Sequence, residues 1–196
     1  MSWSIWKKNL DTLLKDSPSR VPIASVFMAC LRTIHQLEWQ GACHATSAIL
    51  HIALAEHGVP SELCIGEVGI TNGAHGSVAF DHSWIELRGR VFDAAISLPL
   101  DERFRRPPTA MGCNLVTQQP TDLLYGLKTG LEPDPAAATI LTMDFAAFMV
   151  MEQDLWRVTA DLLLRSGRAT SRDALRAKHG SSVSRRNYYS NGEPVR

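Results

Sequence analysis

The chain lacks a charge excess and lacks long hydrophobic runs. Its 20 lysine and arginine residues balance 20 aspartate and glutamate residues, which leaves a formal net charge of zero. A chain without net charge has no overall electrostatic attraction to nucleic acid or to a membrane surface. No apolar run reaches the roughly 20 residues that a transmembrane helix needs, and residues 1–8 carry no secretory signal core. We therefore expect a cytoplasmic protein without a membrane partner.

Cysteine is also scarce, and its spacing excludes two classes of small domain. The four cysteines are Cys30, Cys43, Cys64 and Cys113, and no two of them form a C-x-x-C pair. This spacing argues against a zinc knuckle and against a dense disulfide framework. Cys30 lies among apolar residues and is expected in the core. We predict neither a metal nor a cofactor, and in a reducing cytoplasm a functional thiol stays reduced.

The length and composition fit one domain with an appendage. A chain of 196 residues that is 45% apolar is sufficient for a sizeable single core. We expect residues 1–165 to form one domain and residues 166–196 to form a basic, flexible tail, because the latter carry seven basic residues against two acidic ones. Composition favours a solvated tail over a contact with nucleic acid or an acidic partner, with one helical stretch near residues 172–178.

The hydrophobic pattern predicts an α+β fold. Apolar residues at three- and four-residue spacing indicate helices, and alternation indicates strands. The predicted helices are residues 3–14, 21–37, 43–57 and a long one at 143–164; the predicted strands are residues 62–70, 80–87 and 91–95. Residues 97–135 are rich in proline, glycine and threonine and are predicted to form long loops that wall a cleft. Helices followed by an antiparallel meander are typical of the α+β class.

Cys43 stands at the start of a strongly apolar predicted helix. Small and aliphatic residues recur from Ala45 to Ala55, and Gly58 with Pro60 ends the helix. The N–H groups of a first helical turn are unpaired and the dipole is positive there, which favours a thiolate over a thiol. The two small residues before Cys43 leave room for a substrate. A cysteine at a helix start can equally serve packing, so a role in chemistry depends on partners downstream.

A predicted hairpin supplies those partners. If residues 88–89 form a two-residue turn, Asp93 lies opposite Trp84 on the preceding strand. Asp93 then shares a sheet face with His82 and is one diagonal step away, within side-chain reach. The neighbouring apolar side chains collect on the other face, which is consistent with this register. A slip of one residue in the turn would move Asp93 to the wrong face.

Cysteine, histidine and aspartate form the set that thiol chemistry requires: a thiolate attacks an acyl carbon, an imidazole carries the proton and a carboxylate orients the imidazole. Cys43 at a helix start, the strand His82-Ser83-Trp84-Ile85-Glu86-Leu87, a short turn and Val91-Phe92-Asp93 resemble the transglutaminase-like superfamily of papain-type thiol enzymes. The likeness covers residues 39–95. It implies a papain/transglutaminase-like arrangement in which the nucleophile helix packs on a small antiparallel sheet.

The resemblance also implies an activity and roles. Cys43 would be the nucleophile, His82 the general base and acid, and Asp93 the orienting carboxylate. The reaction would be amide hydrolysis or acyl transfer, of peptidase, amidase or transglutaminase type, on a peptide or protein substrate through an acyl-enzyme thioester. The candidates for oxyanion or substrate contact are Gln36, Gln40, His44 and Trp84, together with the Cys43 backbone N–H.

Three alternatives stay open. His44 departs from the bulky aromatic residue that many members carry after the cysteine, and both glutamines also fit plain surface positions. A catalytically inactive family member would use the Cys43 cleft to bind a peptide or protein. A metal site of Cys43, His44, His75 and His82 matches no zinc spacing closely. An ordinary α+β domain would use the same residues for packing, since fold alone implies no chemistry.

Overall fold

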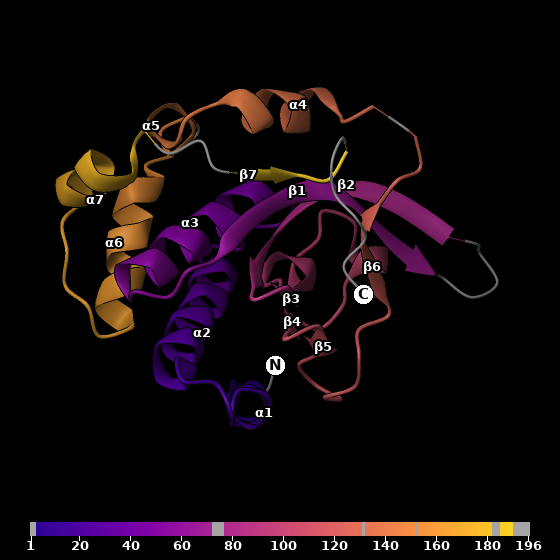
Figure 1. The fold of residues 1–196 in the computed structure, drawn as a ribbon, viewed down its shortest axis with the longest axis horizontal. Coiled ribbons are helices and arrows are strands. Elements are labelled where there is room, and N and C mark those ends of the chain that lie inside the picture. The colour runs from indigo at the N-terminus through magenta and orange to yellow at the C-terminus, as the bar shows by residue number, and fades with distance from the viewer. Residues whose placement is uncertain (1–2, 72–76, 131, 152, 182–184, 190–196) are drawn as a thin grey trace.

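A computed structural model describes residues 3–71, 77–130, 132–151, 153–181 and 185–189 (Figure 1). Three N-terminal helices come first, a curled, largely antiparallel sheet follows, and helices return near the C-terminus, which confirms the α+β class. The helices are α1 (Trp3–Leu13), α2 (Arg20–Gln36), α3 (Cys43–Glu56), α4 (Pro135–Thr142), α5 (Phe145–Phe148), α6 (Leu155–Arg165) and α7 (Arg172–His179). Among the described residues, no helix is long and apolar enough to cross a membrane.

The main sheet has the strand order β3-β2-β1-β6, with β7 pairing β1 beside β6. The strands are β1 (Glu62–Thr71), β2 (Ser77–Leu87), β3 (Arg90–Phe92), β6 (Leu123–Leu127) and β7 (Arg185–Asn187); β4 (Thr109–Ala110) and β5 (Cys113–Asn114) form a separate pair. All pairings in the main sheet are antiparallel except that of β7 with β1. The long strands β1 and β2 therefore form the centre of the sheet: β3 pairs with β2, and β6 and β7 pair with β1.

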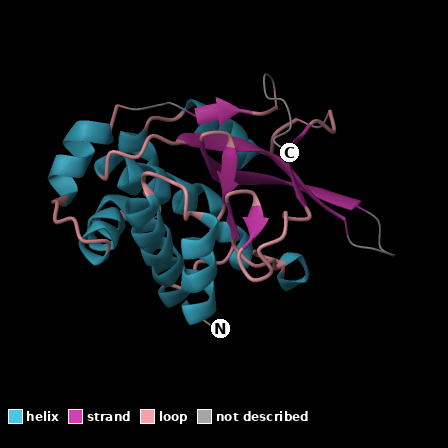
Figure 2. Ribbon diagram, turned by 60° about the horizontal axis from the view of Figure 1, so that its bottom comes forward, coloured by secondary structure: helices cyan, strands magenta, loops and turns pink. Residues whose placement is uncertain are grey.

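Alternation along β1 and β2 sends side chains to two separate cores. Leu63 and Ile85 belong to the larger core, which the helices share, and Figure 2 shows the helices gathered to one side of the strands. Trp84 and Tyr125 belong to a smaller core on the other face. Contacts of α3 with β2, α2 and α6 make α3 the central helix. Cys43, the candidate nucleophile, thus belongs to a helix that packs against both the sheet and two other helices.

The predicted long helix at residues 143–164 is wrong. The structure divides it into α5 and α6, with a break after Phe148. Asp144 accepts a hydrogen bond from the Ala147 N–H, and Asp154 accepts one from the Arg157 N–H, so each helix begins with its own aspartate cap. Apolar spacing continues through the break because Met149 packs in the core there, and periodicity alone therefore could not locate it.

The segment from Ser166 onward was predicted to be a basic, flexible tail, and its described residues include a helix and a short strand, α7 and β7. The helical stretch predicted near residues 172–178 is confirmed as α7. Buried Glu56 of α3 accepts hydrogen bonds from Lys178 at 2.7 Å and from His179 at 2.8 Å. Burial alone would raise the pKa of Glu56, but these two hydrogen bonds lower it to about 2. This buried carboxylate thus contributes, together with the buried Leu175, to holding α7 on the body, a contact that charge counting does not reveal.

The last described residues complete the sheet. Arg185–Asn187 pair in parallel with residues 63–65 of β1, and the following Tyr188 is fully buried. The Tyr188 hydroxyl donates to Glu86 Oε1 at 2.6 Å, and its ring packs on Trp84 with centroids 5.2 Å apart. A Cβ added at Gly66 would lie 2.6 Å from the Tyr188 Cβ, so glycine is what allows this close approach.

Candidate active site

The chain enters α3 through a left-handed turn that exposes the helix start. Glu38 and Gly41 have φ of 52° and 68°, and the Gly41 N–H donates to the Leu98 carbonyl at 2.9 Å. The N-cap residue is Ala42, whose side chain cannot cap the helix, and Cys43 is the first helical residue. Cys43 is a free, partly exposed cysteine. Its first-turn N–H groups are therefore available to a ligand at the positive end of the helix dipole.

The β2–β3 hairpin has the predicted register. Arg88 and Gly89 form the turn with φ of 53° and 70°, and Ile85 pairs with Phe92. The His82 Nε2 lies 2.8 Å from the Asp93 Oδ2, so the predicted proximity is confirmed. Both side chains are buried, at 4% and 1% exposure. Hydrogen bonding of Nε2 to the carboxylate leaves Nδ1 as the ring nitrogen that can serve Cys43.

Two further donors hold the Asp93 carboxylate in place. The Tyr125 hydroxyl donates to Oδ2 at 2.9 Å, and the Ile96 N–H donates to Oδ1 at 3.2 Å. Instead of pairing further with β2, Asp93 forms a bridge to Thr109. Sequence reasoning missed Tyr125, since it assigned residues 97–135 to loops. The apolar, aromatic run from Leu123 to Leu127 was the available signal for strand β6.

The electrostatics of His82 differ from those of an ordinary buried histidine. Burial alone would lower the pKa of His82, but the Asp93 charge, the Cys43 sulfur and hydrogen bonds from the ring to both residues raise it to about 10. The ring is therefore protonated at neutral pH, between an aspartate on one side and a cysteine on the other. A histidinium beside a cysteine is the kind of environment in which reactive thiols occur in proteins.

His44 lies beside Cys43, His82 and Asp93, but unlike His82 it is uncharged. Its Nδ1 lies 2.5 Å from the Ser83 hydroxyl, on the sheet face that α3 covers. Burial and the charge of His82 lower the pKa of His44 to about 4. His44 is therefore neutral at neutral pH, and it lines a groove that begins at Gly41 and Ala42 next to Cys43.

The other three candidate contact residues lie in different parts of the fold, and Gln40 is the one in the turn before the thiol. Trp84 is fully buried in the smaller core, where its indole N–H donates to Glu86 at 3.1 Å. Gln36 is exposed on α2 and accepts a hydrogen bond from Arg165. Gln40 is exposed in the turn before Cys43, and its side chain has no hydrogen-bond partner among the described residues. Of the two glutamines, Gln40 thus keeps a free amide near the thiol.

The remaining cysteines and the metal alternative can be placed as well. Burial, and then the Asp93 charge, raise the pKa of the Cys30 thiol; burial and the Glu86 charge raise that of Cys64. Among the described residues, no group of three or more histidine, cysteine, aspartate or glutamate side chains is arranged to hold a metal ion. His75 of the metal alternative lies outside the described residues.

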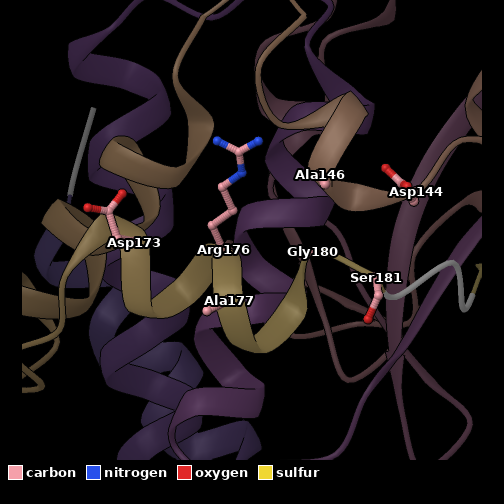
Figure 3. Close-up of a pocket in the computed structure, with 7 residues that line it drawn as sticks. All are labelled: Asp144, Ala146, Asp173, Arg176, Ala177, Gly180 and Ser181. Carbon is pink, nitrogen blue, oxygen red and sulfur yellow. The ribbon is translucent and has the colours of Figure 1, made fainter.

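A second surface pocket, of about 450 Å³, lies between the start of α5 and helix α7. Figure 3 shows Asp144 and Ala146 on one side of it and Asp173 and Arg176, from α7, on the other. It shares no lining residue with the groove beside Cys43 and contains no member of the triad. The candidate chemistry is therefore confined to the start of α3 and the β2–β3 hairpin.

Comparison with protein-family models, with curated proteins and with solved structures found no match for this chain.

Proposed function

We propose that the chain is a cysteine-dependent amide hydrolase or acyltransferase of the transglutaminase-like, papain-type class. The observation that carries the proposal is the position of His82 between Asp93, to which its Nε2 is hydrogen-bonded at 2.8 Å, and Cys43, whose sulfur contributes to the raised pKa of His82. These three residues come from a helix start, a strand and the end of a hairpin, and the carboxylate is buried and held by two further donors. A fixed orientation of all three groups is what nucleophilic thiol catalysis needs.

The chemistry follows from the protonation of the pair. The Cys43 thiolate attacks the substrate's acyl carbon, and the carbonyl oxygen gains the negative charge. His82 then gives its proton to the leaving amine nitrogen as the C–N bond breaks, leaving a thioester on Cys43. Neutral His82 next takes a proton from water or from an acceptor amine, whose attack releases the acyl group and restores the thiolate. Asp93 keeps the ring oriented and stabilises its positive charge.

Stabilisation of the oxyanion is assigned to the start of α3. The backbone N–H of Cys43 belongs to a helix whose N-cap Ala42 offers no competing side-chain acceptor. Such first-turn N–H groups favour negative charge. The Gln40 side chain is the second donor that we propose, because it is exposed three residues before the thiol in the same turn.

The arrangement of elements supports the same class. The nucleophile helix packs directly on the strand that carries the histidine, and the aspartate follows on the hairpin, in the order that the family resemblance implies. We therefore propose the papain-like arrangement for the fold as a whole.

The test is the rate of iodoacetamide alkylation of each cysteine, read by peptide mass spectrometry, in wild type and in His82→Ala. Cys113 is the matched control, since it is also a free, partly exposed cysteine, while Cys30 and Cys64 are buried. We expect Cys43 to react faster than the other cysteines at pH 6. In His82→Ala it should lose that advantage, while the rate of Cys113 stays unchanged. Slow alkylation of Cys43 that is indifferent to His82 would refute the proposal and favour an inactive, peptide-binding protein.

A further inference from the structure

Tyr125 of β6 contacts the candidate triad from the smaller core. The residue is 1% exposed, and its hydroxyl donates to Asp93 Oδ2 at 2.9 Å. The same oxygen lies 2.8 Å from His82 Nε2, whereas the other carboxylate oxygen, Oδ1, accepts only the Ile96 N–H, at 3.2 Å, among the described residues. The phenol and the imidazole therefore share one carboxylate oxygen.

We propose that Tyr125 is a positioning residue that limits how strongly Asp93 holds the proton on His82. The inference rests on the proposed function, because it takes His82 to carry the proton for the Cys43 thiol. It adds a fourth residue to the triad with a role of its own, which is to keep the His82 proton available for release to the leaving group.

The two donors compete for the negative charge of Asp93. A hydrogen bond to the charged form of a carboxyl group stabilises that form, whatever the state of the imidazole. The more of this stabilisation Tyr125 supplies, the less the ionised carboxylate gains from a proton on His82. Without the hydroxyl, the buried carboxylate would depend on His82 and on the longer bond from Ile96. Tyr125 therefore lowers the proton affinity of His82 below the value that it would have without this hydrogen bond.

A moderated proton affinity suits the role proposed for His82. Burial alone would lower the pKa of His82, but the Asp93 charge and the Cys43 sulfur raise it to about 10. A general acid works best with a pKa near the operating pH, so a further rise would hinder proton transfer to the leaving amine. Tyr125 remains a donor, because burial and then the Asp93 charge raise its own pKa well above the usual range.

The backbone of β6 is irregular directly after Tyr125. The register of β6 against β1 shifts by one residue at Gly126. Gly126 has φ of 72°, a left-handed conformation that glycine adopts readily, and a Cβ added there would lie 2.7 Å from the Tyr188 ring. One-residue bulges re-aim side chains and are frequent next to active sites. This bulge is a second, independent feature that marks the position of Tyr125.

The experiment follows the titration of the His82 ring by NMR in protein with carbon-13-labelled histidine, the signal being assigned with His82→Ala. Tyr125→Phe removes the hydroxyl and keeps the ring, whereas 3-fluorotyrosine in place of Tyr125 makes the hydroxyl a stronger donor. We expect the His82 titration to move to higher pH by roughly 1 unit in Tyr125→Phe, the usual weight of a hydrogen bond to a charged group. With 3-fluorotyrosine it should move to lower pH.

The other titratable groups around this cluster are unchanged in both variants. Cys43 and His44 of α3 act on His82, Cys30 of α2 acts on Asp93, and Asp122 acts on Tyr125. A shift in the His82 titration therefore reports the Tyr125 hydrogen bond.

Tyr188→Phe is the matched control. Like Tyr125, Tyr188 is buried and packs on Trp84 with ring centroids 5.2 Å apart, and its hydroxyl donates to a carboxylate, that of Glu86. Glu86 does not belong to the triad, so this variant should leave the His82 titration unchanged. Urea unfolding shows which variants are folded, and if Tyr125→Phe is not, the fluorinated protein decides, because it keeps the hydroxyl and nearly the same shape.

The outcomes separate this inference from the proposed function. A His82 titration that does not move, or that moves to lower pH in Tyr125→Phe, would overturn the role of Tyr125, while His82-dependent alkylation of Cys43 by iodoacetamide upheld the thiol chemistry. Alkylation of Cys43 that does not depend on His82 would overturn the proposed function and this inference with it.

Discussion

Replacement of Asp93 by asparagine is expected to remove the positive charge of the His82 imidazole at neutral pH. The change keeps the size of the side chain but removes the charge from a group 2.8 Å from the imidazole. The neighbouring His44 has no carboxylate hydrogen-bonded to its ring, and burial together with the charge of His82 lowers its pKa to about 4. In Asp93→Asn, the pKa of His82 should fall from its value of about 10, because the Asp93 charge is the strongest of the contributions that raise it. We expect the ring to lose its positive charge at neutral pH.

The size of the effect follows from thiol ionisation. A thiol without a charged partner ionises near pH 8.5, so its thiolate fraction, and with it its alkylation rate, rises roughly 80-fold between pH 6 and pH 8. A thiolate held by a protonated histidine is already formed at pH 6, and its rate changes only about twofold over this range. We expect Cys43 to follow the second course in wild type and the first in Asp93→Asn.

The assay is the iodoacetamide rate of Cys43 at several pH values, with thermal unfolding measured in parallel to show that the variant is folded. Asp122→Asn is the matched control, because that exposed aspartate pairs only with Arg106 among the described residues. A folded Asp93→Asn protein whose Cys43 rate stays flat from pH 6 to pH 8 would refute the reasoning.

Three further predictions concern stability. Gly66→Ala should lower the free energy of unfolding by about 1–3 kcal/mol, because the new Cβ would lie 2.6 Å from the Tyr188 Cβ; an unchanged urea midpoint would contradict this packing. Tyr188→Ala should cost about 3–5 kcal/mol, since it empties a buried site and removes a donor to Glu86; near-ultraviolet circular dichroism and urea unfolding measure it. The lowered pKa of Glu56 gives stability that is present above the unfolded value near 4.5 and is lost as pH falls toward 2. The urea midpoint should therefore fall less steeply on acidification in Glu56→Gln than in wild type, and equal slopes would exclude this carboxylate as the source.

Local patterns in the sequence were enough to predict α1 to α3, the β2–β3 hairpin and the approach of His82 to Asp93. These features depend on spacing within one element or across one tight turn. The hairpin was predictable because its turn residues adopt positive φ and its aliphatic face admits a single register. The same reasoning placed Cys43 at a helix start.

Features that depend on distant pairing could not be predicted. Tyr125 reaches Asp93 because β6 pairs with β1, and the sequence of neither strand indicates which strand it pairs with. The far wall of the groove comes from α4 and α5, which meet α3 only in the folded protein. The break after Phe148 depends on the aspartate cap at Asp154, a signal that the apolar spacing around it obscured. Trp84 lies in the second core, and the sequence of a strand does not distinguish an aromatic residue that faces a ligand from one that faces such a core.

The parallel pairing of β7 with β1 also bears on the order in which a ribosome-bound chain matures. The pairing joins Arg185 to Leu63, so β1 is synthesised long before the strand that covers this part of its edge. Contacts across so long an intervening loop form late. Arg185 also donates to the Met143 carbonyl and stacks over Phe145 of α5, so the groove wall is braced by the same late event. The helix that carries Cys43 is therefore synthesised before the strand and the arginine that brace the far wall of this groove.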